Sequence, residues 1–127
     1  MSDVLQWIVI GLGGAAGAMM RYRISLHVSH IVGDGFPWGT LVVNVIGCLV
    51  LGLLVALVSG KYPIGDIARS GLQVGLLGGF TTFSAFSLEL VQMAEDGFWI
   101  NGLLYIVASL FLCVLAIVLG TALGRQF

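Results

Sequence analysis

The chain alternates long apolar runs with short polar segments, and this pattern predicts four membrane-spanning helices. Each predicted helix has the roughly 20 residues that are needed to cross a bilayer. Backbone groups must be satisfied internally in lipid, and the two-residue alternation of a barrel strand is absent, so we expect helices. Pro37 and Pro63, with nearby glycines and charged residues, mark the first two connections. The expected helices are approximately residues 4–28, 39–60, 69–93 and 98–124.

The composition supports this assignment and excludes several classes of protein. Charged residues make up 9% of the 127 residues, compared with about 25% in soluble domains. The formal net charge of −1 provides no basic surface for nucleic acid. Four spans use about 80 residues, so we expect one transmembrane domain over residues 1–127. The first charged residue is Asp3, not a lysine or arginine, so we interpret the beginning as a retained helix and not as a signal peptide.

Glycines recur at four-residue intervals within the predicted helices. Small residues at this spacing let the backbones of membrane helices approach one another closely. The pattern therefore predicts tight packing within the bundle, and it leaves open whether some of these glycines also lie at a subunit interface. The glycines concerned are Gly13 and Gly17, then Gly71, Gly75 and Gly79, and finally Gly120 and Gly124.

The positive charges are almost evenly divided between the two sides of the membrane. Four spans place both termini and the second connection on one side, and the first and third connections on the other. Orientation normally follows an excess of Lys and Arg on the cytoplasmic side. A near-tie predicts insertion in both orientations, and hence an antiparallel homodimer; a single orientation set by another signal is the alternative. The residues counted are Lys61, Arg69 and Arg125 against Arg21 and Arg23.

Two weakly polar stripes run through the second and fourth predicted helices. Polar groups deep in a span are costly and are therefore candidates for function. Residues four apart share a helix face, so the stripes indicate either a solute pathway or hydrogen bonds between helices, worth about 0.6–2 kcal/mol each. The stripes consist of Thr40, Asn44 and Cys48, and of Tyr105, Ser109 and Cys113.

The two cysteines lie inside apolar runs, where we interpret them as small packing residues. No Cys or His in the chain has the spacing of a metal-ligand pair. We therefore expect neither a zinc site nor a redox site at Cys48 or Cys113.

The segment Gly78–Ser87 predicts a break in the third helix near the middle of the membrane. Its glycines, threonines and serines are poor residues for a helix interior, because hydroxyls compete for backbone groups. Backbone carbonyls that such a break frees can coordinate a cation. Phe83 and Phe86 are three residues apart and share a face, which fits either core packing or the lining of a pore.

Two charged residues lie within or close to the predicted spans. Glu89 is the only acid within a span, and it either has a role there or marks the approach to the interface. Arg21 follows an apolar run, and its long side chain can extend to the interface or bond to loop carbonyls. We assign structural roles to both residues.

The chain resembles the Fluc (CrcB-type) fluoride channels over essentially its whole length. The resemblance rests on three motifs that occur in the same order, of which the third is the most specific. They are Gly17-x-x-x-Arg21, Gly39-Thr40-Leu41-x-Val43-Asn44, and Gly78-Gly79-x-Thr81-Thr82-Phe83-Ser84-x-Phe86-Ser87-x-Glu89.

The resemblance implies an antiparallel homodimer with two fluoride pores. It implies that Phe83, Phe86, Asn44, Tyr105 and Ser109 line each pore, and we add the hydroxyls of Thr40 and Ser84. It also implies that the backbone carbonyls of Gly78 and Thr81 hold a structural sodium ion (Na+) at the dimer centre. Two residues depart from the family pattern by removing a hydrogen-bond donor, namely Ala85, where many members have Thr, and Cys113, where Ser is common.

We therefore expect a passive channel that exports fluoride from a bacterial cytoplasm across the inner membrane. Hydroxyls, an amide and aromatic ring edges can replace the water around fluoride without a fixed positive charge that would retain it. A proton-coupled small multidrug transporter would need a carboxylate in the first helix, and none occurs between Asp3 and Asp34. A non-transporting scaffold would leave the third-helix motif unexplained. No combination of nucleophile and base suggests an enzyme.

Overall fold

Four long apolar segments form the computed structural model, which describes residues 1–127 and contains helices but no strands. Each segment is long and apolar enough to cross a membrane, as the hydrophobic pattern predicted. The first helix continues to Val32, beyond the expected end at residue 28, and stops at Gly33, whose φ of +94° favours glycine. The helices are α1 (Ser2–Val32), α2 (Trp38–Ser59), α3 (Asp66–Arg69), the π-helix η1 (Ser70–Leu77), α4 (Gly78–Phe80), α5 (Phe83–Glu95) and α6 (Trp99–Gly124).

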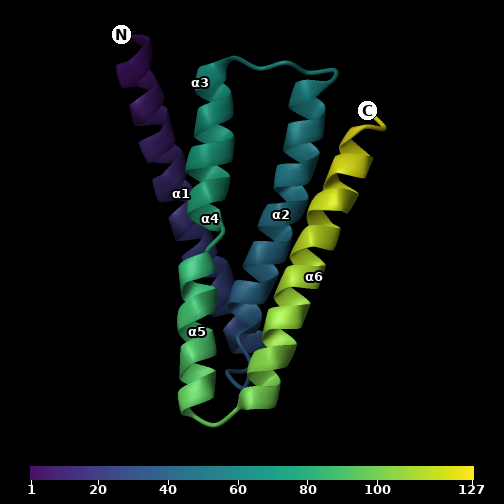
Figure 1. Ribbon diagram of the computed structural model, residues 1–127. Coiled ribbons are helices and arrows are strands. Elements are labelled where there is room, and N and C mark those ends of the chain that lie inside the picture. The colour runs from purple at the N-terminus through teal and green to yellow at the C-terminus, as the bar shows by residue number, and fades with distance from the viewer.

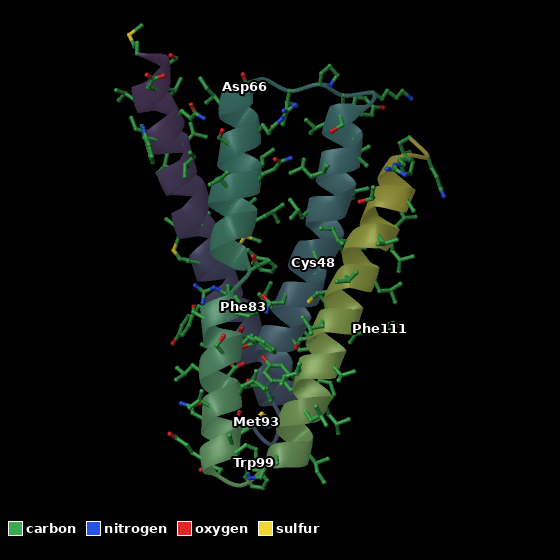
Figure 2. The ribbon with its side chains drawn as sticks, viewed as in Figure 1. Cys48, Asp66, Phe83, Met93, Trp99 and Phe111 are labelled. Carbon is green, nitrogen blue, oxygen red and sulfur yellow. The ribbon has the colours of Figure 1, made fainter.

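The helices form two closely packed pairs that diverge from one end of the molecule (Figure 1). One pair is α1 with η1 and α4, and the other is α2 with α6. Both termini and the connection between α2 and α3 lie at the open end, while the other two connections lie at the opposite end (Figure 1). Apolar side chains such as Phe111 cover the outside of the bundle, as expected for contact with lipid (Figure 2).

Glycines bring the backbones of each pair into direct contact, which confirms the packing predicted from their spacing. A Cβ atom added to Gly17 would overlap the backbone of Leu76 in η1 and approach that of Phe80. In the other pair, a Cβ atom on Gly120 would overlap the carbonyl of Leu49 in α2. Any larger residue at these positions would therefore separate the helices.

The predicted break in the third span is confirmed, and it is confined to two residues. Thr81 and Thr82 have extended backbones, with ψ angles of 155° and 120°, between the end of α4 and the start of α5. Gly78 and Gly79 remain helical, and Gly79 packs against the backbone of Gly14 in α1. The glycines thus set the contact with α1, and the threonines interrupt the helix.

Candidate functional site

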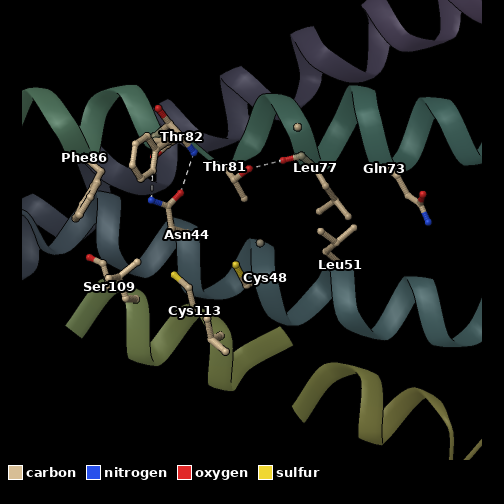
Figure 3. Close-up of a pocket in the computed structure, with 15 residues that line it drawn as sticks. Asn44, Cys48, Leu51, Gln73, Leu77, Thr81, Thr82, Phe86, Ser109 and Cys113 are labelled. Carbon is tan, nitrogen blue, oxygen red and sulfur yellow. Dashed lines mark hydrogen bonds between the residues drawn. The ribbon is translucent and has the colours of Figure 1, made fainter. Parts of the chain in front are cut away.

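A pocket of about 330 Å³ opens between the two helix pairs at the level of the break. Its walls come from α2, η1, α4, α5 and α6, and the two extended threonines form part of its lining (Figure 3). None of the lining side chains carries a charge. The polar or sulfur-containing ones belong to Asn44, Cys48, Gln73, Thr81, Thr82, Ser109 and Cys113.

The side chain of Asn44 holds the break in place. Its Nδ2 donates to the carbonyl of Thr82 at 2.9 Å, and its Oδ1 accepts the backbone N–H of Thr82 at 2.8 Å (Figure 3). An amide carries two donor hydrogens, so Asn44 keeps one N–H that these bonds do not use. The residue can therefore support the backbone and still present a donor to a solute.

Thr82 begins α5 by capping its first turn. Its Oγ1 accepts the backbone N–H of Ala85 at 3.2 Å and lies 3.2 Å from the hydroxyl of Ser84. Phe83 and Ser84 are the first residues of α5, so their N–H groups have no carbonyl partner within that helix. Ser84 is exposed and lies outside the pocket lining.

The two phenylalanines of α5 both line the pocket but differ in exposure. Their ring centroids are 5.4 Å apart. Phe86 is buried and also contacts the ring of Tyr105, at 4.9 Å between centroids. Phe83 is 74% exposed, at the first turn of α5 (Figure 2). An aromatic ring left uncovered at this depth is a surface that another molecule or lipid must cover.

A second polar cluster joins α2, α5 and α6 beside the pocket. The hydroxyls of Thr40 and Tyr105 each donate to the carboxylate of Glu89 at 2.6 Å, one to each oxygen. Glu89 therefore makes specific contacts within the span, which the sequence had left undecided. The two stripes divide between these sites, because Asn44, Cys48, Ser109 and Cys113 face the pocket whereas Thr40 and Tyr105 contact Glu89.

Arg21 lies within α1, not in a connection, because the helix continues for eleven residues beyond it to Val32. Its Nε donates to the carbonyl of Gly79 at 3.1 Å, just before the break. The expected carbonyl partner thus belongs to the third span and not to a loop. Arg21 secures α1 to the last turn that precedes Thr81.

The backbone carbonyls of Gly78 and Thr81 lie at the break, and the Thr81 oxygen accepts no hydrogen bond. Outside the helices the chain has thirteen backbone–backbone hydrogen bonds, and none ends on the oxygen of Gly78 or Thr81. No side chain donates to either oxygen; the hydroxyl of Thr81 donates to Leu77 instead. These are the two carbonyls that the family resemblance implies as ligands of a cation.

Residues 8–121 match the family described as CrcB-like protein, Camphor Resistance (CrcB). The chain belongs to the CrcB family. Its relatives include the fluoride-specific ion channel FluC of Rhizobium johnstonii, which is 42% identical over 96% of this chain and 98% of its own length. The protein of the same name from Chloroflexus aurantiacus is 40% identical over 94% of this chain and 95% of its own. The protein of this name from Magnetococcus marinus is 44% identical over 91% of this chain and 94% of its own length.

The pocket therefore lies within the part of the chain that is common to the CrcB family, since all its lining residues fall between Asn44 and Val114. Sequence reasoning missed two polar lining residues, Gln73 and Thr82, and the proximity of Cys48 to Cys113. Gln73 interrupts an apolar run and was detectable on that ground. The two cysteines are 65 positions apart, and nothing in their local sequence indicates that they meet.

Proposed function

We propose that this protein is a passive fluoride channel in the bacterial inner membrane and that it exports fluoride from the cytoplasm. Membership of the CrcB family and the names of relatives that align over almost their whole length support this function. The single observation that carries it is a pocket at mid-span with polar donors and aromatic rings but no charged lining residue.

Fluoride is small and strongly hydrated, so a pathway must replace water with equivalent donors. The free N–H of Asn44, the hydroxyl of Ser109 and the ring edges of Phe83 and Phe86 provide such contacts. A lysine or arginine in the pocket would hold the anion too tightly for release. Thr40 and Tyr105 extend the polar route toward Glu89, where their hydroxyls are already bonded.

The functional unit in this proposal is an antiparallel homodimer. One chain leaves Phe83 and Ser84 exposed at the break, together with Gly78. A second copy, inserted in the opposite orientation, would cover this surface because both breaks would lie at the same depth. Reporter fusions to the C-terminus should locate it on both sides of the membrane in comparable amounts. A strongly one-sided result would rule out dual insertion.

The carbonyls of Gly78 and Thr81 fit a structural sodium ion in that dimer. Two oxygens from each chain would give four hard ligands, and no side chain donates to either oxygen. The ion would offset the partial negative charge of the converging carbonyls. Replacing sodium with a large organic cation should therefore weaken the dimer and lower fluoride flux, and full flux without sodium would contradict the site.

Fluoride efflux from liposomes that contain the pure protein tests the main proposal. Efflux should occur without a proton gradient, should not change when one is imposed, and should greatly exceed the efflux of chloride. Efflux that requires a proton gradient would indicate a coupled transporter. No efflux from correctly folded protein would favour a scaffold.

A further inference from the structure

The two cysteines of the chain lie near each other on the α2–α6 wall of the pocket, although they belong to different helices. Cys48 lies on α2 and Cys113 on α6, and both line the pocket (Figure 3). Both thiols are free and half-buried, and Figure 3 shows the two side chains near each other in the pocket lining. The sequence analysis interpreted each of them as a small packing residue, which does not account for two thiols that share one cavity.

The packing of α2 against α6 fixes the separation of the two backbone segments that carry the thiols. Gly120 contacts the carbonyl of Leu49, the residue after Cys48, and Gly52 contacts the backbone of Ile117, one turn beyond Cys113. These backbone contacts leave little freedom to move the helices apart. The thiols are therefore placed before any ligand arrives, which lowers the entropic cost of binding both.

The ligand set selects one class of metal ion. Thiolate sulfur prefers soft cations, and two sulfurs without a further ligand suit an ion that accepts linear two-coordination. No three His, Cys, Asp or Glu side chains are grouped so that they could hold one metal ion, so a tetrahedral zinc site is not available. Monovalent copper and silver and divalent mercury accept two sulfur ligands.

We propose that Cys48 and Cys113 together bind one soft, thiophilic cation, and that the bound ion obstructs the pocket. With divalent mercury, two metal–sulfur bonds form, the two thiols release two protons, and the complex is neutral. No oxidant is required. Obstruction rests on the proposed channel function, because Asn44 and Ser109 share this pocket, whereas metal binding does not depend on it.

Binding is measured on the purified full-length protein by native mass spectrometry after addition of mercuric ion and an excess of a small monothiol. The wild type should retain one mercury per chain, with a mass that corresponds to the loss of two protons. Cys48→Ala and Cys113→Ala each keep a single thiol and should lose mercury to the competitor. Two-point attachment should raise affinity by roughly 10²–10⁴-fold over either single variant. The double variant gives the baseline, and circular dichroism verifies that each variant is folded.

Two results would overturn the site. One is a folded single variant that retains mercury as strongly as the wild type does. The other is wild-type protein that binds two mercury ions, each of which is coordinated by one cysteine sulfur and one molecule of the monothiol. Both would show that the thiols act separately.

Obstruction is tested by fluoride efflux with and without mercuric ion, each protein being compared with its own untreated rate. Wild-type efflux should nearly stop and should recover after addition of a dithiol chelator, while Cys48→Ala should keep its rate in the presence of the monothiol. Unchanged efflux from mercury-loaded wild type would refute obstruction. If the wild type binds mercury in the mass measurement but shows no fluoride efflux even before mercuric ion is added, the proposed channel function is wrong and the metal site stands.

Discussion

The two halves of the third span are held in the bundle by different means. The half before the break, Asp66–Phe80, packs on α1 through Gly71, Gly75 and Gly79, which meet the α1 backbone or Val9. The half after it, Phe83–Glu95, is positioned by Phe86 and by hydrogen bonds to Glu89. The first half thus depends on the absence of side chains, and the second on particular side chains. Substitutions at the glycine contact between the first half and α1 should impair folding, whereas substitutions around the second half should impair transport.

The largest effect is expected from Gly17→Ala, which tests the glycine-packed half. The new Cβ atom would overlap the backbone of Leu76, and backbone cannot move aside as a side chain can. Overpacking of this kind costs about 1–3 kcal/mol and occasionally more. A measurement of unfolding in detergent should show this loss of stability. Gly11→Ala in the same helix is the matched control, because nothing lies within 4 Å of its added Cβ atom. Equal stability of the two variants would contradict the packing described.

Asn44→Asp should be the most severe substitution for transport. A carboxylate cannot donate to the carbonyl of Thr82, so one of the two bonds that hold the break is lost. Its charge would also repel an anion, by roughly 4 kcal/mol at 4 Å with an effective dielectric constant of 20. Fluoride efflux should fall by orders of magnitude. Asn44→Ala removes both bonds without adding a charge, and it should retain more flux. If Asn44→Asp conducts more fluoride than Asn44→Ala does, charge repulsion is not the cause of the lost efflux.

Phe83→Ile and Phe86→Ile test whether aromatic ring edges serve the anion. Both replacements are apolar but lack the ring edge, so each should slow fluoride efflux. Phe86 is buried against Tyr105, and its replacement should also reduce stability by about 1 kcal/mol. Phe83 is largely exposed in the single chain, so Phe83→Ile gives the cleaner measurement. Wild-type efflux through both folded variants would leave packing as the better explanation.

The smallest effect is expected from Thr81→Ser, at the junction of the two halves. Serine keeps the backbone carbonyl and a hydroxyl that can donate to Leu77, and it loses only the methyl group that contacts α2 at Gly47. Stability should fall by about 1 kcal/mol, with little change in flux or in sodium dependence. A large loss of sodium dependence in Thr81→Ser would implicate the side chain and not the carbonyl.

The local features of the chain could be predicted from its sequence, and the contacts between distant residues could not. The apolar runs gave the four spans, and the hydroxyls around Thr81 indicated the break. The partners of Glu89 were not predictable, because Thr40 and Tyr105 reach it only once three helices have packed. The end of α1 was placed too early, at residue 28, although no Gly or Pro that would stop the helix occurs between Arg23 and Gly33.

The break described above has a further electrostatic consequence. The helical run that ends at Phe80 directs its last carbonyls toward the break, where those of Leu77 and Gly79 accept bonds from Thr81 and Arg21. The first N–H groups of α5 point toward the break from the other side. These two ends carry opposite partial charges of about half an elementary charge each. The interior of the bundle therefore has a fixed negative pole and a fixed positive pole at its centre. Both come from peptide dipoles and do not titrate, so a change in pH alters the attraction of the α5 end for an anion only through other groups.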